Sequence, residues 1–375
     1  SWNQMKSLKV RLKPTDEQLT KLIQSSGTHR FIYNWTLAKQ QESYKQNHTF
    51  LHDSILRKDI TQLKKEDNFK WLSNVSNDIP KQAIKDACHA YKRFFKGFSK
   101  FPKFKTKRKS KPSFYNDTSK LKVKKNSVRL SKVGWVKISE QLPMNTKYYN
   151  PRISFDGKYW YISISVDTKK DMPLLNDTSL GIDLGIKSLA VCSDGNVFKN
   201  INKSHHVKKK EKRLRRLQRK VSRKYQMNKK GGTFAKTCNI IKIEKEICLL
   251  QRTLSNIRKN HLHQSTTSIV KTKPRRIVIE DLNVSGMMKN KHLSKHIQQQ
   301  GFYEFRRQLA YKCEWYGIEL VIADRYYPSS KRCYSCGHIK KDLKLSDRVY
   351  SCKCGYKEDR DLNASLNLSQ YQSVA

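Results

Sequence analysis

Two closely spaced pairs of cysteines near the C-terminus constrain the fold of this chain most. The pairs are Cys333-x2-Cys336 and Cys352-x-Cys354, with 15 residues between them and a glycine directly after each pair. Four thiolates in two such turns can bind Zn²⁺ tetrahedrally, and glycine lets the chain turn back under the metal without a Cβ clash. We therefore predict a structural zinc site, because four thiolates leave no open coordination position. The second pair is one residue shorter than the commonest spacing, so His338 is kept as an alternative ligand.

Three acidic residues occur where predicted strands or helices would present them. Asp183 lies within a short apolar strand, Glu280 ends the apolar run that begins at Ile277, and Asp361 opens the segment DLNAS. An acid in or at the end of an apolar strand is costly to bury unless a positive group or a metal meets it. Phosphodiester cleavage by two Mg²⁺ ions needs such a cluster of oxygen ligands, in which Asp183 would bridge the metals.

Each acid also has a simpler interpretation. A single acid at a strand end is often a solvated terminus, and Asp361 alone could be a helix N-cap. The segment GIDLG around Asp183 resembles the first phosphate loop of the Hsp70 and actin-like ATPases, but the sequence has no second, glycine-rich phosphate loop. The three acids together, rather than any one of them, favour the metal site.

The chain carries a large excess of positive charge. Its 375 residues include 79 Lys plus Arg against 31 Asp plus Glu, which gives a formal net charge of +48. A compact chain with this charge repels itself and requires a polyanion, for which nucleic acid is the obvious candidate. The segment 208–224 has 11 basic residues and one acid. We predict a helix there that contacts phosphates, rather than a solvated charged face, through Arg213, Arg216, Arg219, Lys220 and Arg223.

Hydrophobic periodicity divides the chain into parts. A strand at 8–12 is followed by helical periodicity over 15–98, which starts at a capping box formed by Thr15 and Gln18. Short alternating runs and an Asp156-Gly157 hairpin signal then predict a small basic sheet or barrel, which the first strand completes. Farther along, the pattern predicts an antiparallel helical hairpin (208–224 and 240–257), strands at 180–184, 189–192, 276–282 and 318–323, and one helix over 297–316.

Four C-terminal segments, in this order, resemble the signature motifs of the TnpB family. Members of this family are transposon-encoded, RNA-guided DNA nucleases related to the type V CRISPR effectors. The segments are GIDLGIKSLAV (181–191), IVIEDLN (277–283), YPSSKRCYSC (327–336) and DRDLNASL (359–366). RFIYNW (30–35), FPKFK (101–105) and GWVKI (134–138) also match, so the resemblance covers nearly the whole chain. The Cys-x-Cys pair departs from the Cys-x2-Cys of many relatives.

The resemblance implies a multidomain α+β protein. One part would be a RuvC-like nuclease domain with an RNase H fold (178–324 and 356–375), which a zinc-ribbon insertion that binds target nucleic acid (325–355) interrupts. The other part would be a basic β-barrel wedge domain (1–14 and 99–170), which a helical recognition lobe (15–98) interrupts. Asp183, Glu280 and Asp361 would be the catalytic residues and would bind two Mg²⁺ ions, and the four cysteines would bind one Zn²⁺. By family position, Lys81 and Gln82 are candidates for reading base edges.

The implied partners are a guide RNA from the transposon end and double-stranded target DNA beside a short flanking motif. No stretch approaches the roughly 18 apolar residues of a membrane span, and cysteines grouped for metal binding indicate a reducing compartment. We therefore expect a cytoplasmic protein that is not secreted. The resemblance adds that it is prokaryotic and nucleoid-associated; the sequence leaves the oligomeric state open, with a monomer favoured.

Two functions from different classes stay open. The first is an RNA-guided, Mg²⁺-dependent endonuclease that cuts both DNA strands with one site, and the second is an RNA-guided DNA-binding repressor or transposon accessory factor with little cleavage. The presence of all three acids favours the first. A DDE transposase shares the fold but has its acids in the order Asp, Asp, Glu, whereas this chain has Asp, Glu, Asp.

Overall fold

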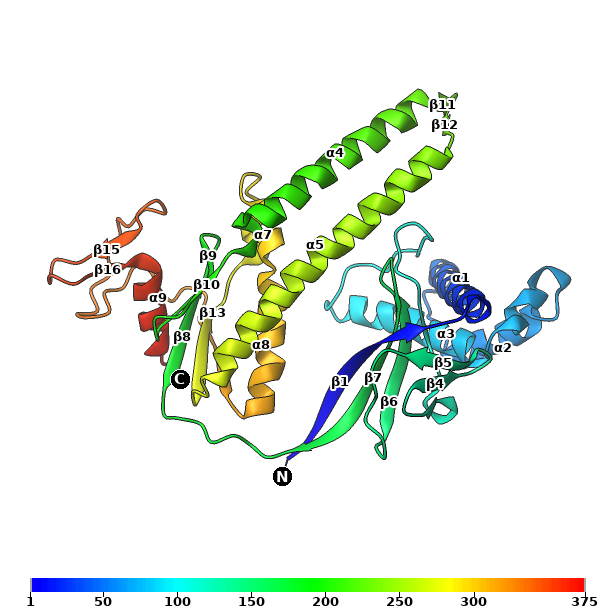
Figure 1. Ribbon diagram of the computed structural model, residues 1–375, viewed down its shortest axis with the longest axis horizontal. Coiled ribbons are helices and arrows are strands. Elements are labelled where there is room, and N and C mark those ends of the chain that lie inside the picture. The colour runs from blue at the N-terminus through cyan, green and yellow to red at the C-terminus, as the bar shows by residue number, and fades with distance from the viewer. Residues whose placement is uncertain (1, 374–375) are drawn as a thin grey trace. The chain divides into compact units, whose positions relative to one another are not determined.

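The computed structural model describes residues 2–373, which form two compact units. Asn3–Lys170 form one unit, and the chain from Asp171 onward forms most of the other. None of the helices within the described residues combines the length and apolar character that a membrane crossing requires. Each unit is described below by itself (Figure 1).

A seven-stranded sheet forms the base of the first unit. Its strand order is β2-β6-β7-β1-β5-β4-β3. The N-terminal strand belongs to this sheet, as predicted, and lies in the middle of it. The hairpin between β6 and β7 turns at Gly157, whose φ is +99°. The strands are β1 (Trp2–Lys13), β2 (Ser113–Tyr115), β3 (Lys122–Val123), β4 (Ser127–Leu130), β5 (Gly134–Ile138), β6 (Tyr148–Phe155) and β7 (Trp160–Lys170). Whether this sheet is the wedge barrel stays a prediction.

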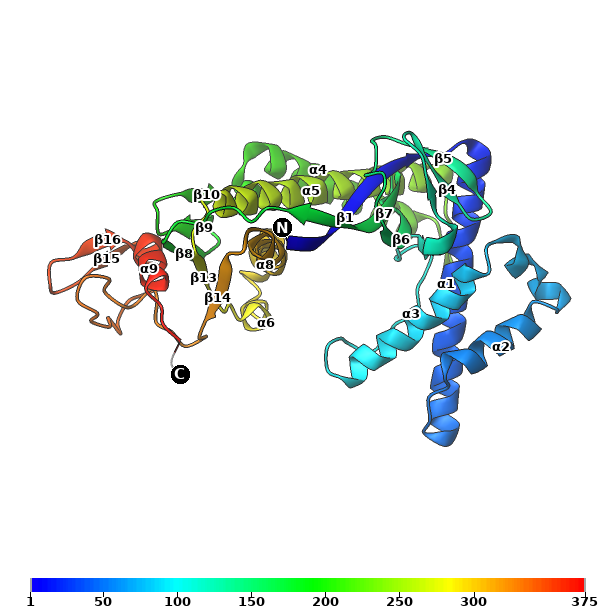
Figure 2. The ribbon, with the colours of Figure 1, turned by 90° about the horizontal axis from the view of Figure 1, so that it is seen from below.

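The helices of the first unit lie between β1 and β2 in the sequence. They are α1 (Asp16–Asn47), α2 (Asp53–Leu63), the 3₁₀ helix η1 (Asp67–Asn74) and α3 (Asp78–Phe95), and a short 3₁₀ turn η2 (Thr118–Lys120) follows β2. The predicted capping box is confirmed: Gln18 N–H donates to Thr15 Oγ1 (3.2 Å), and Thr15 N–H donates to Gln18 Oε1 (3.1 Å). α3 packs across α1 (Figure 2), and α2 packs against α3. Buried residues such as Ile32, Leu56 and Ile84 come from all three helices.

The second unit is built on a five-stranded sheet with the order β10-β9-β8-β13-β14. β13 is parallel to both of its neighbours, and Ile279 lies opposite Ile182 of β8 and Ile322 of β14. The strands are β8 (Ser179–Leu184), β9 (Ser188–Cys192), β10 (Val197–Lys199), β13 (Arg276–Glu280) and β14 (Glu319–Ala323). Helix α9 (Arg360–Ser369) covers one face of the sheet, and α5 and α8 cover the other (Figure 1).

A long helical hairpin extends from this sheet (Figure 1). It consists of α4 (His205–Met227) and α5 (Cys238–Lys271), preceded by the turn η3 (Ile201–Lys203) and joined by the short strands β11 (Lys229–Lys230) and β12 (Thr233–Phe234). Buried Val207, Leu214 and Leu254 lie in the seam between the helices. The predicted hairpin is confirmed, although the joining strands were not expected.

The prediction of one helix over 297–316 is wrong. Two helices occupy this region, α7 (Ser294–Gln300) and α8 (Phe302–Tyr316), and a short α6 (Val284–Met287) precedes them. The break lies at Gly301, whose φ of +67° is left-handed. A left-handed residue ends a helix, and glycine adopts this conformation without steric cost. The apolar spacing continues across the break, which is why periodicity alone missed it.

Candidate functional site

Three acidic side chains meet at one end of the five-stranded sheet. Asp183 is on β8, Glu280 is the last residue of β13, and Asp361 is in the first turn of α9. Because Ile182 lies opposite Ile279 in the parallel pair, the next residues, Asp183 and Glu280, are also neighbours on one face. That face is the one covered by α9, since Val278, two residues before Glu280, packs against Leu368. The structure therefore brings the three predicted acids together.

Gly181 explains how α9 comes so close to β8. A Cβ placed on Gly181 would lie 1.9 Å from the backbone oxygen of Ser365 and 2.5 Å from the backbone nitrogen of Ser369. Gly181 is two residues before Asp183, so both face α9, and Ser365 is one helical turn after Asp361. The contact that requires glycine therefore also places Asp361 over Asp183. Close packing, rather than phosphate binding, accounts for Gly181.

Burial and mutual repulsion raise the pKa values of Asp183 and Glu280 within the acid cluster. The carboxyl group of Asp183 lies within hydrogen-bonding reach of both Glu280 and Asp361. Burial raises the pKa of Asp183 well above its ordinary value, and the charges of Glu280 and Asp361 raise it further. Burial also raises the pKa of Glu280, although Leu184 N–H donates a hydrogen bond to its Oε1 (3.2 Å). A bound cation would relieve this repulsion.

The structure assigns the N-cap of α9 to Asp359. Its Oδ1 accepts hydrogen bonds from the N–H groups of Asp361 (2.9 Å) and Leu362 (3.1 Å). The alternative that Asp361 is the N-cap is therefore wrong, and its carboxylate is available for other contacts. One of these is Arg348, whose Nη2 donates to Asp361 Oδ2 at 2.8 Å. No sequence pattern links Arg348 to Asp361, so sequence analysis missed this contact.

The donor set fits divalent cations that prefer oxygen ligands. All three groups are carboxylates, which Mg²⁺ prefers. Among residues 2–373, the four cysteines are the only group of three or more His, Cys, Asp or Glu residues whose possible metal-binding atoms all lie within 4.8 Å of one another. The three carboxylates are spread more widely. The acids thus form a chain centred on Asp183, with Glu280 and Asp361 on either side. Such a row of carboxylates could hold Mg²⁺, whose positive charge would offset the repulsion among the acids.

The four predicted cysteines form a compact cluster. The Sγ atoms of Cys333 and Cys354 are 3.7 Å apart, and those of Cys336 and Cys352 are 3.5 Å apart. A hydrogen bond from the Cys354 N–H lowers the pKa of the Cys352 thiol to about 7, whereas the hydrogen bond to Cys352 raises the pKa of Cys336 to about 12. A metal would therefore have to displace the proton held between these two sulfur atoms. The donor set fits Zn²⁺, and the alternative ligand His338 is outside the cluster.

The chain around the cysteines folds as their spacing predicts. The glycine after each pair has a left-handed backbone, with φ of +78° at Gly337 and +95° at Gly355. A small antiparallel hairpin of β15 (Val349–Ser351) and β16 (Lys357–Asp359) carries the second pair. The cluster lies in the segment between β14 and α9, and that segment also supplies Arg348.

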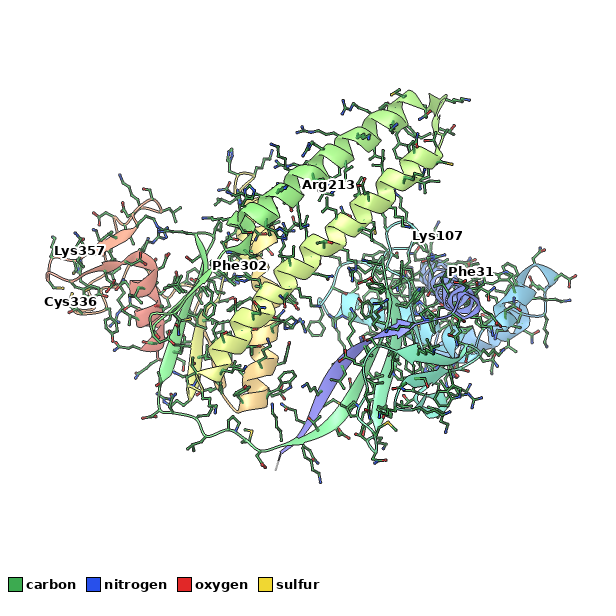
Figure 3. All side chains as sticks on the ribbon, viewed as in Figure 1. Phe31, Lys107, Arg213, Phe302, Cys336 and Lys357 are labelled. Carbon is green, nitrogen blue, oxygen red and sulfur yellow. The ribbon has the colours of Figure 1, made fainter. Side chains whose placement is uncertain are left out.

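The predicted basic residues lie along α4, whose side chains project over its whole length (Figure 3). Arg216, Arg219, Lys220 and Arg223 are exposed, and within the described part of the chain none of them forms an ion pair. Arg213 differs, because its guanidinium pairs with Glu246 of α5.

The two predicted base-reading residues lie in the first unit, on α3. Lys81 is exposed, and the side-chain amide of Gln82 donates to Asp86 Oδ1 at 3.0 Å. Asp86 is also held by Arg152, whose Nη2 lies 2.8 Å from both carboxylate oxygens, and by His29 (3.0 Å). The orientation of Gln82 is therefore fixed by a charged network.

Three family models match the chain. Residues 163–291 match OrfB_IS605, described as "Probable transposase", and residues 302–368 match the Cas12f1-like TNB domain. Residues 5–49 match the helix-turn-helix domain HTH_OrfB_IS605. In this structure, residues 5–49 contain most of β1 and the single helix α1 rather than two helices.

Similar proteins cover almost the full length. InsQ of Escherichia coli K12, whose name provisionally assigns RNA-guided DNA endonuclease activity, is 31% identical over 381 aligned positions, covering 97% of this chain and 91% of InsQ. A protein of Streptomyces pristinaespiralis with the same provisional name is 31% identical over 370 positions, covering 97% and 88%. A solved Cas12f1–sgRNA–target DNA complex contains a chain with the same fold, at a TM-score of 0.60 and 14% identity, covering 98% and 99%.

Proposed function

The chain belongs to the TnpB family, and we propose from this premise that it is an RNA-guided endonuclease of double-stranded DNA. Its partners are a guide RNA and a target DNA, as in the Cas12f1 complex that shares its fold. The observation that carries the proposal is the convergence of Asp183, Glu280 and Asp361 from two strands and a helix. A pure binding protein has no need to hold three carboxylates against one another.

The nuclease domain in this proposal is RuvC-like and spans 178–324 and 356–375. Two features support the assignment. The three acids come, in sequence order, from the neighbouring strands β8 and β13 and from α9, and the segment with the cysteine cluster is inserted just before α9. The inserted segment 325–355 would contact target nucleic acid. In the first unit, 15–98 would be the recognition lobe, and 1–14 with 99–170 would be the wedge domain. Lys81 and Gln82 on α3 would then face the flanking motif.

The three acids would hold the catalytic Mg²⁺ ions. When bound, the two ions supply an activated water and stabilise the leaving 3′ oxygen. Asp183 would be the central ligand, because its carboxyl group reaches both Glu280 and Asp361. The Leu184 N–H holds one oxygen of Glu280, and the other oxygen would serve as a ligand. Arg348 holds Asp361 Oδ2 and orients this carboxylate toward the site.

The cysteine cluster would hold one structural Zn²⁺ and so organise the segment between β14 and α9. Because Arg348 belongs to this segment, an ordered cluster also fixes the arginine that contacts Asp361. A closed site with four thiolates has no free position for water, so cleavage would depend on the carboxylates alone.

Nucleic acid would bind along α4 through its unpaired exposed basic residues. Such contacts neutralise phosphates of a guide–target heteroduplex without reading bases. Arg213 would contribute less than its neighbours, because Glu246 already neutralises it.

The test is a matched pair of acid substitutions in the protein purified with its guide RNA. Asp183→Ala should abolish Mg²⁺-dependent cleavage of a target plasmid while leaving guide RNA and target binding unchanged. Glu319→Ala is the control, because Glu319 is an exposed acid on the same sheet. A wild-type complex that binds its target but does not cut would refute the proposal and favour an RNA-guided repressor.

A further inference from the structure

A pocket of about 330 Å³ adjoins the carboxylates on the second unit. Glu280 and Leu184 line one wall. Glu280 is also one of the three acids, and the Leu184 N–H donates a hydrogen bond to it, so the pocket lies directly beside the acid cluster. The other walls come from the loop after β13, the first turn of α8 and Arg325, which follows β14. Apart from Glu280 and Leu184, none of the lining residues has a role in the function proposed above.

The lining of the pocket is apolar on one side and aromatic at the rim. Leu282 and Val284 line it together with Phe302, which is 4% exposed and lies at the start of α8 (Figure 3). Tyr303 also lines the pocket, yet 78% of its surface is exposed. An apolar wall beside an uncovered aromatic ring suits a flat, partly apolar ligand such as a nucleobase.

Two arginines supply positive charge at the opposite side. Arg306 Nη1 lies 3.8 Å from Asp281 Oδ1, and Arg325 Nη2 lies 3.6 Å from Asp281 Oδ2. These distances are too long for hydrogen bonds, so the guanidinium groups keep their donors for another acceptor. Each side chain is 49% exposed, and one carboxylate balances only one of the two charges. Arginine pairs of this kind bind phosphate groups.

We propose that this pocket binds one nucleotide of the DNA strand that is being cut. Its base stacks on Tyr303 and contacts the apolar wall, and its phosphate lies between Arg306 and Arg325. The adjacent phosphodiester is thereby held at the carboxylates, because Glu280 belongs to both sites. The inference rests on the proposed nuclease function and deepens it by assigning a subsite for the substrate.

The DNA must be single-stranded where it enters this pocket. A base paired in a duplex has its faces covered by stacked neighbours, so it cannot lie flat on Tyr303. A volume of about 330 Å³ also holds one nucleotide rather than a helix. The cut strand is favoured over the guide RNA because the pocket wall is part of the acid cluster.

The test combines a tyrosine substitution with removal of single bases from the substrate. Stacking of a base on an aromatic ring gives Tyr303→Ala an expected loss of about 5- to 150-fold in kcat/KM for cleavage of the target. Tyr303→Phe should retain activity, because the ring remains. Tyr326→Ala is the matched control: Tyr326 is 88% exposed and directly follows Arg325 in the sequence but does not line the pocket.

Abasic nucleotides placed one at a time around the cut site identify the stacked base. For the wild-type protein, one position should slow cleavage by the same factor as Tyr303→Ala. In Tyr303→Ala, an abasic nucleotide at that position should have no further effect, because the stacking is already lost. Arg306→Gln with Arg325→Gln should raise KM for the DNA and leave guide RNA binding unchanged.

Two results would overturn the proposal. Wild-type cleavage rates in Tyr303→Ala, or equal sensitivity of both proteins to every abasic position, would show that no base occupies the pocket while the nuclease function stands. A wild-type complex that never cuts would remove the proposed function itself, and the subsite with it.

Discussion

Replacing Gly181 by alanine should separate the carboxylates without removing any of them. The new Cβ would lie 1.9 Å from the Ser365 oxygen, whereas an ordinary contact needs about 3.4 Å. The atoms that collide are backbone, so no side-chain rotation relieves the contact, and α9 must move by more than 1 Å. Asp361 moves with the helix. A misplacement of about 1 Å at reacting groups can cost about 100-fold in rate, so we expect a loss of this size in cleavage.

The assay is single-turnover cleavage of a target DNA by the purified complex at saturating Mg²⁺. Overpacking also costs ~1–3 kcal/mol of stability, so the thermal midpoint should fall together with the rate. The matched control is Gly185→Ala in the same segment, where the new Cβ would lie 3.4 Å from the Ser188 oxygen. This contact is ordinary, so Gly185→Ala should cut at close to the wild-type rate. Guide RNA binding and zinc content, measured in parallel, show whether the rest of the chain is intact.

The reasoning would be refuted by a Gly181→Ala protein that cuts as fast as the wild type and melts at the same temperature. That outcome would mean that α9 is not held against β8 as closely as the structure indicates. Equal losses in both alanine variants would also refute it, because they would show that glycine matters in this segment for a reason other than the approach of α9.

Three further predictions concern charge and metal. Asp183→Asn should stabilise the metal-free protein at pH 7. Burial and its acidic neighbours raise the pKa of Asp183 in the folded protein above its ordinary value of 3.8. Ionisation of Asp183 therefore lowers the free energy of unfolding as the pH rises from 3.8 through the folded pKa. Thermal unfolding in EDTA should show a gain of a few degrees at pH 7, since ~1 kcal/mol corresponds to about 2–4 °C in a domain of this size, and no gain at pH 3. Cys333→Ser should lower both zinc content and the thermal midpoint, because Cys333 is a buried member of the cluster; an unchanged zinc content and midpoint would contradict the zinc assignment. Arg216→Ala with Arg219→Ala should reduce the slope of log affinity for nucleic acid against log salt by about 1.4–1.8, and an unchanged slope would mean that neither residue contacts phosphate.

Local patterns in the sequence predicted most secondary structure correctly. The capping box at Thr15 and the hairpin at Gly157 depend on neighbours within a few residues, so their sequences specify them directly. The single helix expected over 297–316 was wrong because one residue, Gly301, adopts a left-handed φ that apolar spacing does not reveal. The exposed basic face of α4 could be predicted, but the pairing of Arg213 with Glu246 could not, because Glu246 lies on another helix.

The sequence by itself determined the cysteine site and the identity of the three acids. Each pair of cysteines is close in sequence, and a turn with glycine suffices to bring its two thiols together. The meeting of Asp183 with Glu280 and Asp361 was decided by the tertiary structure, because it depends on the register of β8 with β13 and on the approach of α9 to Gly181. The contact of Arg348 with Asp361 and the pocket beside Glu280 likewise exist only in the folded chain. Charges interact over a few ångströms of space, so the pKa of Asp183 is a property of packing that residue order alone does not contain.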